Sequence, residues 1–134
     1  MLIACSFALV ALSFTGCGKK PATLNAVTGR VYYKGATMHD GVIVFSPDTS
    51  RGESGNIAFG KIKTDGTYTL TTGDAPGAAA GWYRVTVSCV TGASSTYDST
   101  PISLIPEKYR DPQLSQLQCE VKVNQDNRLD FNLD

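Results

Sequence analysis

Strict alternation of apolar and polar residues constrains the fold of this chain more than any other feature. Segments in which every second side chain is mainly apolar occur at 27–34, 83–89, 117–123 and 129–133. A period of two is typical of a β-strand that buries one face. The 134 residues include 13 glycines and 6 tyrosines, which favour turns and strands, and no segment has a convincing amphipathic helical pattern. We therefore expect an all-β protein.

The sequence NQDN, at 124–127, lies between the last two alternating segments. Asn and Asp favour turns because their short side chains hydrogen-bond to nearby backbone groups. These residues predict a hairpin that pairs 117–123 with 129–133.

The stretch IAFGKIKTDGTYTLTT predicts a second hairpin, around the Asp-Gly pair at 65–66. A loop of these two residues would place Phe59 opposite Thr72. A longer loop, 63–66, places Phe59 opposite Leu70 and therefore pairs an apolar residue with an apolar residue. We prefer the second register, and both registers put Phe59 and Leu70 on the same face.

Two segments leave alternatives open. Residues 42–45, VIVF, are apolar on both faces, so they form either a central strand covered by a long loop or a contact surface for a partner. The long loop spans 91–116 and contains three prolines, and PEKY within it could form one helical turn that starts at Pro106. This loop is either a packed cover or a contact surface for carbohydrate or protein. In the second case the contact residues would be Tyr97, Lys108, Tyr109 and Arg110.

The N-terminal segment is typical of an export signal. Residues 1–16 contain no Asp, Glu, Lys or Arg, and their apolar run is shorter than the roughly 20 residues of a transmembrane helix. Residues 14–17, FTGC, resemble the bacterial lipobox, in which the cysteine is acylated on sulfur and becomes the new N-terminus. The resemblance implies lipid attachment at Cys17, with the membrane as a partner. The alternative is an ordinary signal peptide followed by a chance cysteine.

We divide the chain into a lipoprotein signal peptide at 1–16, a lipidated cysteine with a flexible tether at 17–26, and a β-domain at 27–134. An extended tether of this length reaches at most about 30 Å, so the domain would lie close to the membrane. Gly18 stands where an Asp retains lipoproteins at the inner membrane of some bacteria. We therefore expect a domain outside the cytoplasm in the cell envelope, with the outer membrane preferred.

Seven strand candidates with closely spaced turn signals predict a single antiparallel β-sandwich. The stretches VTGRVYYKGATMHDGVIVFSP, TDGTYTL, GWYRVTV and CEVKVNQDNRLDFNL resemble, in this order, the transthyretin-like, carboxypeptidase-regulatory-like domain of small bacterial envelope lipoproteins. IPEKYRDPQLSQL resembles a stretch common before the penultimate strand of those lipoproteins. The resemblance covers nearly all of residues 27–134 and implies a seven-stranded Greek-key sandwich in an accessory or adhesive module.

The chain offers little catalytic or metal-binding chemistry. His39 is the only histidine, and no second histidine or paired cysteine motif completes a zinc site. No serine lies in a GxSxG-like motif. The 12 basic and 12 acidic residues balance, which argues against nucleic acid. We expect no catalytic residue, metal, cofactor or nucleic-acid partner.

Cys89 and Cys119 are the cysteines that remain if Cys17 is acylated and Cys5 leaves with the signal peptide. Both fall on apolar faces, and export would place them in an oxidising compartment. We predict a disulfide between Cys89 and Cys119 if their strands lie close enough. The alternative is a pair of buried free thiols.

Two hypotheses of different class follow. In the first, the protein is a non-enzymatic, lipid-anchored module of the cell envelope that contributes structure or binds an envelope protein or polysaccharide. In the second, it is a small periplasmic hydrolase or carrier with a site in the 91–116 loop. We prefer the first, although a fold by itself does not determine function.

Overall fold

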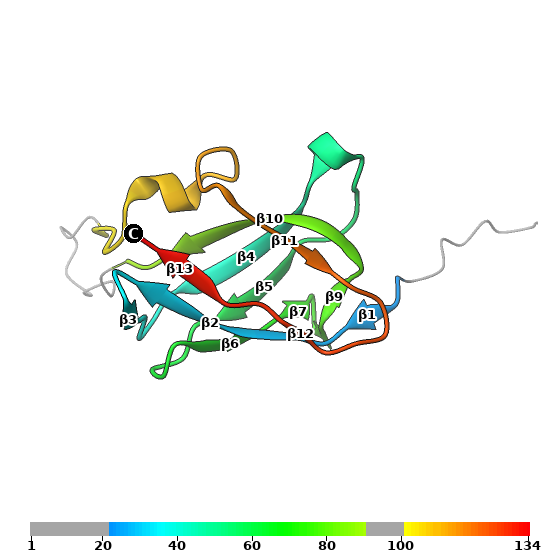
Figure 1. Cartoon of the computed structure of the whole chain (residues 1–134), viewed down its shortest axis with the longest axis horizontal. Helices are drawn as coiled ribbons and strands as arrows, with labels where there is room; N and C mark the ends of the chain where they lie inside the picture. Colours follow the sequence, from blue (N-terminus) through cyan, green and yellow to red (C-terminus); the bar gives the residue numbers. More distant parts are fainter. Residues whose placement is uncertain (1–21, 91–100) are drawn as a thin grey trace, which may run out of the picture.

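Strands β4 (Val42–Pro47) and β10 (Gly81–Ser88) form the middle of the larger of two facing sheets (Figure 1). The computed structural model describes residues 22–90 and 101–134. The larger sheet has 6 antiparallel strands in the order β11-β10-β4-β5-β7-β8. Its other members are β5 (Ala58–Lys61), β7 (Thr71–Thr72), β8 (Ala75–Pro76) and β11 (Leu117–Val121).

Strand β2 (Val27–Tyr33) is the centre of the second sheet. Along one side it pairs in parallel with β12 (Asn127–Arg128) and β13 (Phe131–Leu133). Along the other side it pairs antiparallel with β3 (Ala36–Thr37) and β6 (Thr67–Thr69). The described residues contain no α-helix, and the short turns η1 (Thr49–Arg51) and η2 (Glu107–Arg110) are of the 3-10 type. The protein is therefore an all-β, sandwich-like domain, as the alternation predicted.

The core confirms the predicted faces of most strands. Side chains that alternate along β2, β4 and β10 are buried between the two sheets. The ring of Phe45 lies 5.8 Å from that of Tyr83, 5.9 Å from that of Phe131 and 6.2 Å from that of Tyr68. Because these four rings come from four strands of both sheets, Phe45 holds the centre of the core.

The predicted C-terminal hairpin is wrong. Strand β11 pairs with β10, whereas β12 and β13 cross to the other sheet and run parallel to β2. The sandwich is therefore not antiparallel throughout. Residues 124–127 do form a turn, but the buried side chain of Asn127 holds it as a crossover: Oδ1 accepts from the Lys122 amide at 2.8 Å and Nδ2 donates to the Gln125 carbonyl at 3.1 Å.

Neither predicted register for the central hairpin is correct. The Lys63 amide donates to the Thr67 carbonyl, which leaves 64–66 as the loop and places Phe59 opposite Thr71. This register lies between the two that we compared. Because a shift by a single residue reverses the face, Phe59 is 47% exposed whereas Leu70 is buried.

The outer side of β4 remains partly open. Ile43 and Phe45 are buried, as expected for a central strand, but Val42 is 39% exposed beside the exposed Phe59 of β5. The part of the long loop that the structure describes therefore leaves this face uncovered.

Residues 101–116 instead close the side of the sandwich between β10 and β13. Ile105, Tyr109 and Ser115 are buried, and Ser115 Oγ donates to the Val85 carbonyl at 2.7 Å. The Tyr109 hydroxyl hydrogen-bonds to the carboxylate of Asp134. The cover alternative is thus confirmed for the described part of the loop. The helical turn begins after Pro106, which is its N-cap and not its first residue.

The folded domain begins before the predicted boundary. Leu24–Asn25 forms β1, which pairs with β9 (Ala78–Ala79). Asn25 is buried, its amide lies 3.4 Å from the Ala78 carbonyl, and its Oδ1 accepts from the Asn124 amide at 3.0 Å. The predicted signal peptide and Cys17 lie outside the described residues.

Candidate binding groove

A groove opens at the end of the sandwich opposite to β1. In Figure 1 β1 lies on the right, whereas β3, the start of β4 and the end of β10 lie on the left. The groove has an apolar half between the β3–β4 connection and residues 104–105. Its polar half continues past His39 and Asp40 to 61–64. We call these two adjoining halves the distal groove.

Backbone contacts hold the walls of the apolar half. The Leu104 amide donates to the Cys89 carbonyl at 2.8 Å, and Val90 pairs with Ser103 in an isolated bridge. On the other wall Gly41 has a φ of +131°, and a Cβ there would lie 2.6 Å from the Ser88 carbonyl oxygen. Glycine is required at this position because it permits both the conformation and the close approach.

The apolar half has a volume of about 300 Å³, at the small end of the range for ligand pockets. Buried Met38, Cys89 and Ile105 contribute to its lining. Leu104 lies at the rim with 55% of its surface exposed. An exposed leucine above a buried apolar lining can contact an apolar group from outside the domain.

His39 and Asp40 separate the two halves. His39 Nδ1 lies 2.8 Å from the Thr64 carbonyl oxygen. Because a carbonyl only accepts, Nδ1 carries the proton in this bond. One carboxylate oxygen of Asp40 accepts from the Gly41 amide at 2.8 Å. Both side chains are thus held in place while their residues stay exposed.

The polar half, with a volume of about 560 Å³, carries Lys61 and Lys63. Both residues are exposed, and neither ammonium group takes part in an ion pair among the described residues. Asp40 is the carboxylate that lines this half, so the lysines give it a net positive charge. The distal groove therefore combines an apolar floor with a cationic end.

The described lining of the groove offers apolar side chains, two ammonium groups, one carboxylate and one imidazole. No group of three or more His, Cys, Asp or Glu residues that could hold a metal ion is found in residues 22–90 and 101–134. Burial, with a smaller contribution from the Asp40 carboxylate, raises the pKa of the Cys89 thiol. The thiol is therefore protonated at neutral pH and a poor nucleophile.

The predicted disulfide is wrong, because Cys89 and Cys119 are both free. Both thiols do point into the core, as parity predicted. Cys119 lies opposite Tyr83, however, whereas Cys89 follows the far end of β10, about 20 Å further along the strand. A disulfide tolerates a Cα separation of roughly 4.4–6.8 Å, so the register excludes it. Burial raises the pKa of the Cys119 thiol to about 12.

The predicted contact residues do not form one surface. The Tyr109 side chain is buried under its own loop, so the prediction that Tyr109 is a contact residue is wrong. Tyr97 lies outside the described residues. Lys108 and Arg110 are exposed beside a second hollow of about 590 Å³. Their charges are already paired, with Asp134 at 3.6 Å and Glu107 at 3.1 Å. This hollow is a weaker candidate than the distal groove.

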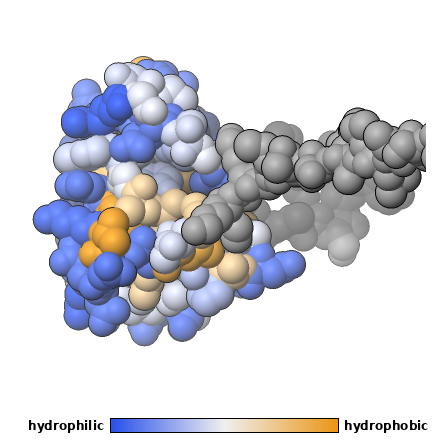
Figure 2. Space-filling model, turned by 90° about the vertical axis from the view of Figure 1, so that its right-hand side faces the viewer, coloured by the Kyte–Doolittle hydropathy of each residue, from blue (hydrophilic) through white to orange (hydrophobic). Residues whose placement is uncertain are grey.

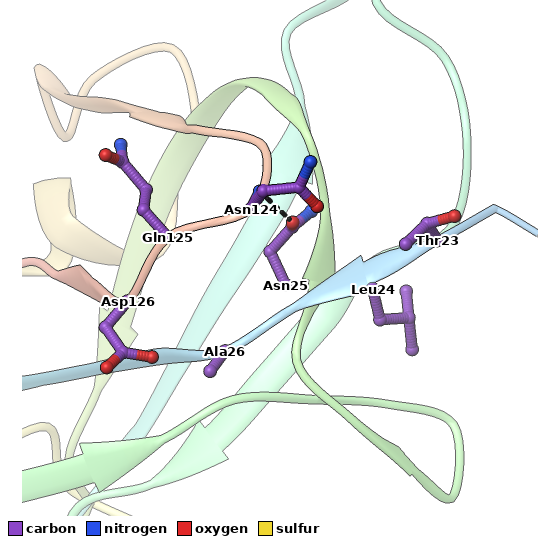
Figure 3. A pocket seen from close by; sticks show the side chains of 7 residues that line it. All are labelled: Thr23, Leu24, Asn25, Ala26, Asn124, Gln125 and Asp126. Atoms are coloured by element: carbon purple, nitrogen blue, oxygen red, sulfur yellow. Dashed lines mark hydrogen bonds between the residues drawn. The ribbon is translucent and has the colours of Figure 1, made fainter.

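A third hollow, of about 410 Å³, lies at the β1 end between residues 23–26 and 124–126 (Figure 3). In Figure 3 the side chains of Gln125 and Asp126 point in different directions and do not converge on one position. Figure 2 looks onto this end of the molecule and shows apolar residues near the middle of a largely hydrophilic surface. The polar lining of the third hollow and its place at the β1 end distinguish it from the distal groove.

Leu104, Lys61 and Lys63 were not identified as site residues from the sequence. The first is a single apolar residue in a loop, and the lysines follow ordinary strand alternation. Only the fold brings these positions to the same end.

Comparison of the chain with protein-family models, with curated proteins and with solved structures finds no match. Among the described residues, no helix has the length and apolar character needed to span a membrane.

Proposed function

We propose that this protein is a non-enzymatic, lipid-anchored module of the cell envelope that binds an envelope protein or polysaccharide through the distal groove. The position of the groove carries the proposal, because it opens at the end opposite to β1 (Figure 1). A lipid on Cys17 would hold the β1 end towards the membrane. The groove would then face away from the membrane, where a partner can reach it.

We also propose that the domain is a transthyretin-like Greek-key sandwich. Two facing sheets and the order of the sequence motifs support a transthyretin-like Greek-key sandwich. Such a domain serves as an accessory or adhesive module in the lipoproteins that the sequence resembles. A lipid-anchored position at the outer membrane agrees with Gly18 after the cysteine.

The alternative of a hydrolase or carrier with a site in the 91–116 loop has less support. In the described part of that loop, Tyr109 is buried against Asp134, and the charges of Lys108 and Arg110 are paired. These contacts stabilise a cover, and they leave few free groups for chemistry.

Lipidation predicts that Cys17→Ser releases the protein from the membrane. Two or more acyl chains give stable anchoring, since each buried CH₂ contributes about 0.8 kcal/mol. We expect the variant to move from the membrane fraction to the soluble fraction and to lose metabolic labelling with a fatty acid. Intact mass of the wild-type protein provides the direct measurement, and a mature N-terminus without acyl chains would contradict the proposal.

Binding through the groove is tested by capture from solubilised envelopes with the full-length protein as bait. Leu104→Ser and the double variant Lys61→Glu/Lys63→Glu should each lower capture of the same partner at least tenfold. Val123→Ser is the matched control, because Val123 is 61% exposed and lies beside the β1 end. Capture that is absent, or equal for all variants, would overturn the proposed function.

A further inference from the structure

Resting on the proposed function, we propose that the distal groove binds an extended peptide segment of an envelope protein. The segment would place an aliphatic side chain in the apolar half and an Asp or Glu carboxylate in the polar half. Three features of the described part of the groove select this class of ligand: its apolar floor, the outer edge of β3, and two lysines that form no ion pair with a described residue.

The apolar floor selects an aliphatic side chain. Met38, Cys89 and Ile105 are buried, and Leu104 lines the same half with 55% of its surface exposed. The hydrophobic effect favours an apolar group that displaces water from such a floor. The Tyr33 ring also lines this half, but the Lys34 ammonium lies 5.3 Å from its centroid. The aliphatic lining therefore suits a Leu or Ile side chain better than a sugar ring.

Among the described residues β3 pairs with β2 alone, and its outer edge selects a main chain in extended conformation. Ala36 and Thr37 line the groove, and they pair with Tyr33 and Tyr32 of β2. In an antiparallel ladder, successive residues direct their N–H and C=O groups to alternate sides. The Met38 amide donates to the Val31 carbonyl, so the backbone groups of Thr37 point away from β2. A peptide strand can pair with such an edge, whereas a fatty acid cannot satisfy both groups.

The charge distribution selects an acidic residue in the same peptide. Lys61 and Lys63 have no ion-pair partner in the described ranges, and they lie beyond His39 from the apolar half. Asp40 is the opposing carboxylate in the groove, and one of its oxygens accepts from the Gly41 amide. The other oxygen can accept a peptide N–H. A carboxylate beside the two lysines therefore gains complementary charge.

The experiment is selection from a display library of random decapeptides with the full chain carrying Cys17→Ser, which needs no detergent. We expect the selected sequences to combine Leu, Ile or Val with Asp or Glu a few residues away. Synthetic versions should lose at least tenfold in affinity when the aliphatic residue is replaced by Ser or the acidic residue by Lys. Leu104→Ser in the protein should cause a similar loss, and Lys61→Glu/Lys63→Glu should reverse the preference for the acidic peptide.

Two control variants, Val123→Ser and Lys122→Glu, change exposed positions away from the groove and should bind the selected peptides as tightly as the protein with an unaltered groove. Circular dichroism melting checks that every variant folds. No enriched sequence class, enrichment of basic peptides, or equal binding by Leu104→Ser would overturn the inference. Groove-dependent binding of sodium decanoate without any peptide would also overturn the inference, because it would identify a site for amphiphiles.

The two proposals fail separately. Groove-dependent capture of a polysaccharide in the envelope experiment would leave the binding function standing and overturn the peptide inference. Peptide binding with no groove-dependent capture from envelopes would support peptide recognition by the groove and overturn the proposed function.

Discussion

Asp48 is a buried carboxylate, and both of its oxygens contact polar groups. Its Oδ1 accepts from the Ser50 hydroxyl at 2.6 Å and from Arg84 Nε at 3.1 Å, and its Oδ2 lies 3.4 Å from Arg51 Nε. Arg51 in turn lies over the Trp82 ring, 4.1 Å from its centroid. This cluster fixes the η1 turn against β10, because three of its members come from the connection and two from the strand.

The cluster predicts a dependence of stability on pH. The hydrogen bond from the Ser50 side chain, and then Arg84, hold the pKa of Asp48 below its ordinary value of 3.8. A lowered pKa in the folded state contributes stability above the ordinary value, and this contribution is lost as the pH falls through the folded value. Asp48→Asn should therefore lower the urea midpoint at about pH 6, and the difference from wild type should shrink towards about pH 2.

The control is Asp126→Asn, which alters an exposed carboxylate and should leave the urea midpoint unchanged at both pH values. A difference between Asp48→Asn and wild type that stays constant as the pH falls would contradict the electrostatic role of this cluster.

Gly29 of β2 lies very close to the C-terminal segment and to Tyr68 of β6. A Cβ at this position would lie 1.8 Å from the Leu129 carbonyl oxygen and 2.8 Å from Cε1 of Tyr68. Gly29→Ala should therefore push the C-terminal segment away and lower the free energy of unfolding by about 3 kcal/mol or more. Urea unfolding gives the measurement, with Thr28→Ala on the exposed face as the control. A loss smaller than about 1 kcal/mol would show that this packing is loose.

At the scale of the elements, the buried side chain of Asn127 spans the crossover from β11 to β12. Asn127 hydrogen-bonds through Oδ1 and Nδ2 to backbone groups of Lys122 and Gln125. Asn127→Ala removes these part-buried hydrogen bonds, so we expect a loss of about 2–3 kcal/mol in unfolding free energy. Asn132→Ala, at an exposed position of β13, should cost less than about 0.5 kcal/mol in the same denaturation experiment. Equal losses would show that Asn127 does not hold the crossover.

The elements themselves were predictable because alternation is a local property. The faces of β2, β10 and β11 follow directly from the residues in each strand. The choice of partner is not local: the NQDN turn suits a hairpin and a crossover equally, and the fold chooses the crossover. The predicted register of the central hairpin was wrong by a single residue, because the sequence motif fixes the turn but not the length of its loop.

The distal groove was even less predictable. His39 is exposed between β3 and β4. Its neighbours Leu104 and Lys61 come from segments far apart in the sequence. No periodicity or motif links such positions, because only the pairing of the strands brings them together.

At the scale of the whole molecule, stability comes from packing and hydrogen bonds without a cross-link between Cys89 and Cys119. Reductant should therefore leave the melting temperature unchanged. Alkylation under denaturing, non-reducing conditions should label both thiols, whereas alkylation of the folded protein should be slow because both are buried. A fall in melting temperature with reductant, measured by circular dichroism, would contradict the free-thiol state.

The parallel pairing of β2 with β13 has a mechanical consequence. Strand β2 runs from the β1 end to the groove end, and β13 runs beside it in the same direction (Figure 1). If Cys17 anchors the protein and a partner occupies the groove, as proposed, a pull on that partner would load the ladder along its length. Hydrogen bonds that lie across the direction of tension share the load in shear and must break together, whereas a hairpin opens one bond at a time. A protein that joins a surface to a partner under flow or growth would gain from a tension-resistant ladder of this kind.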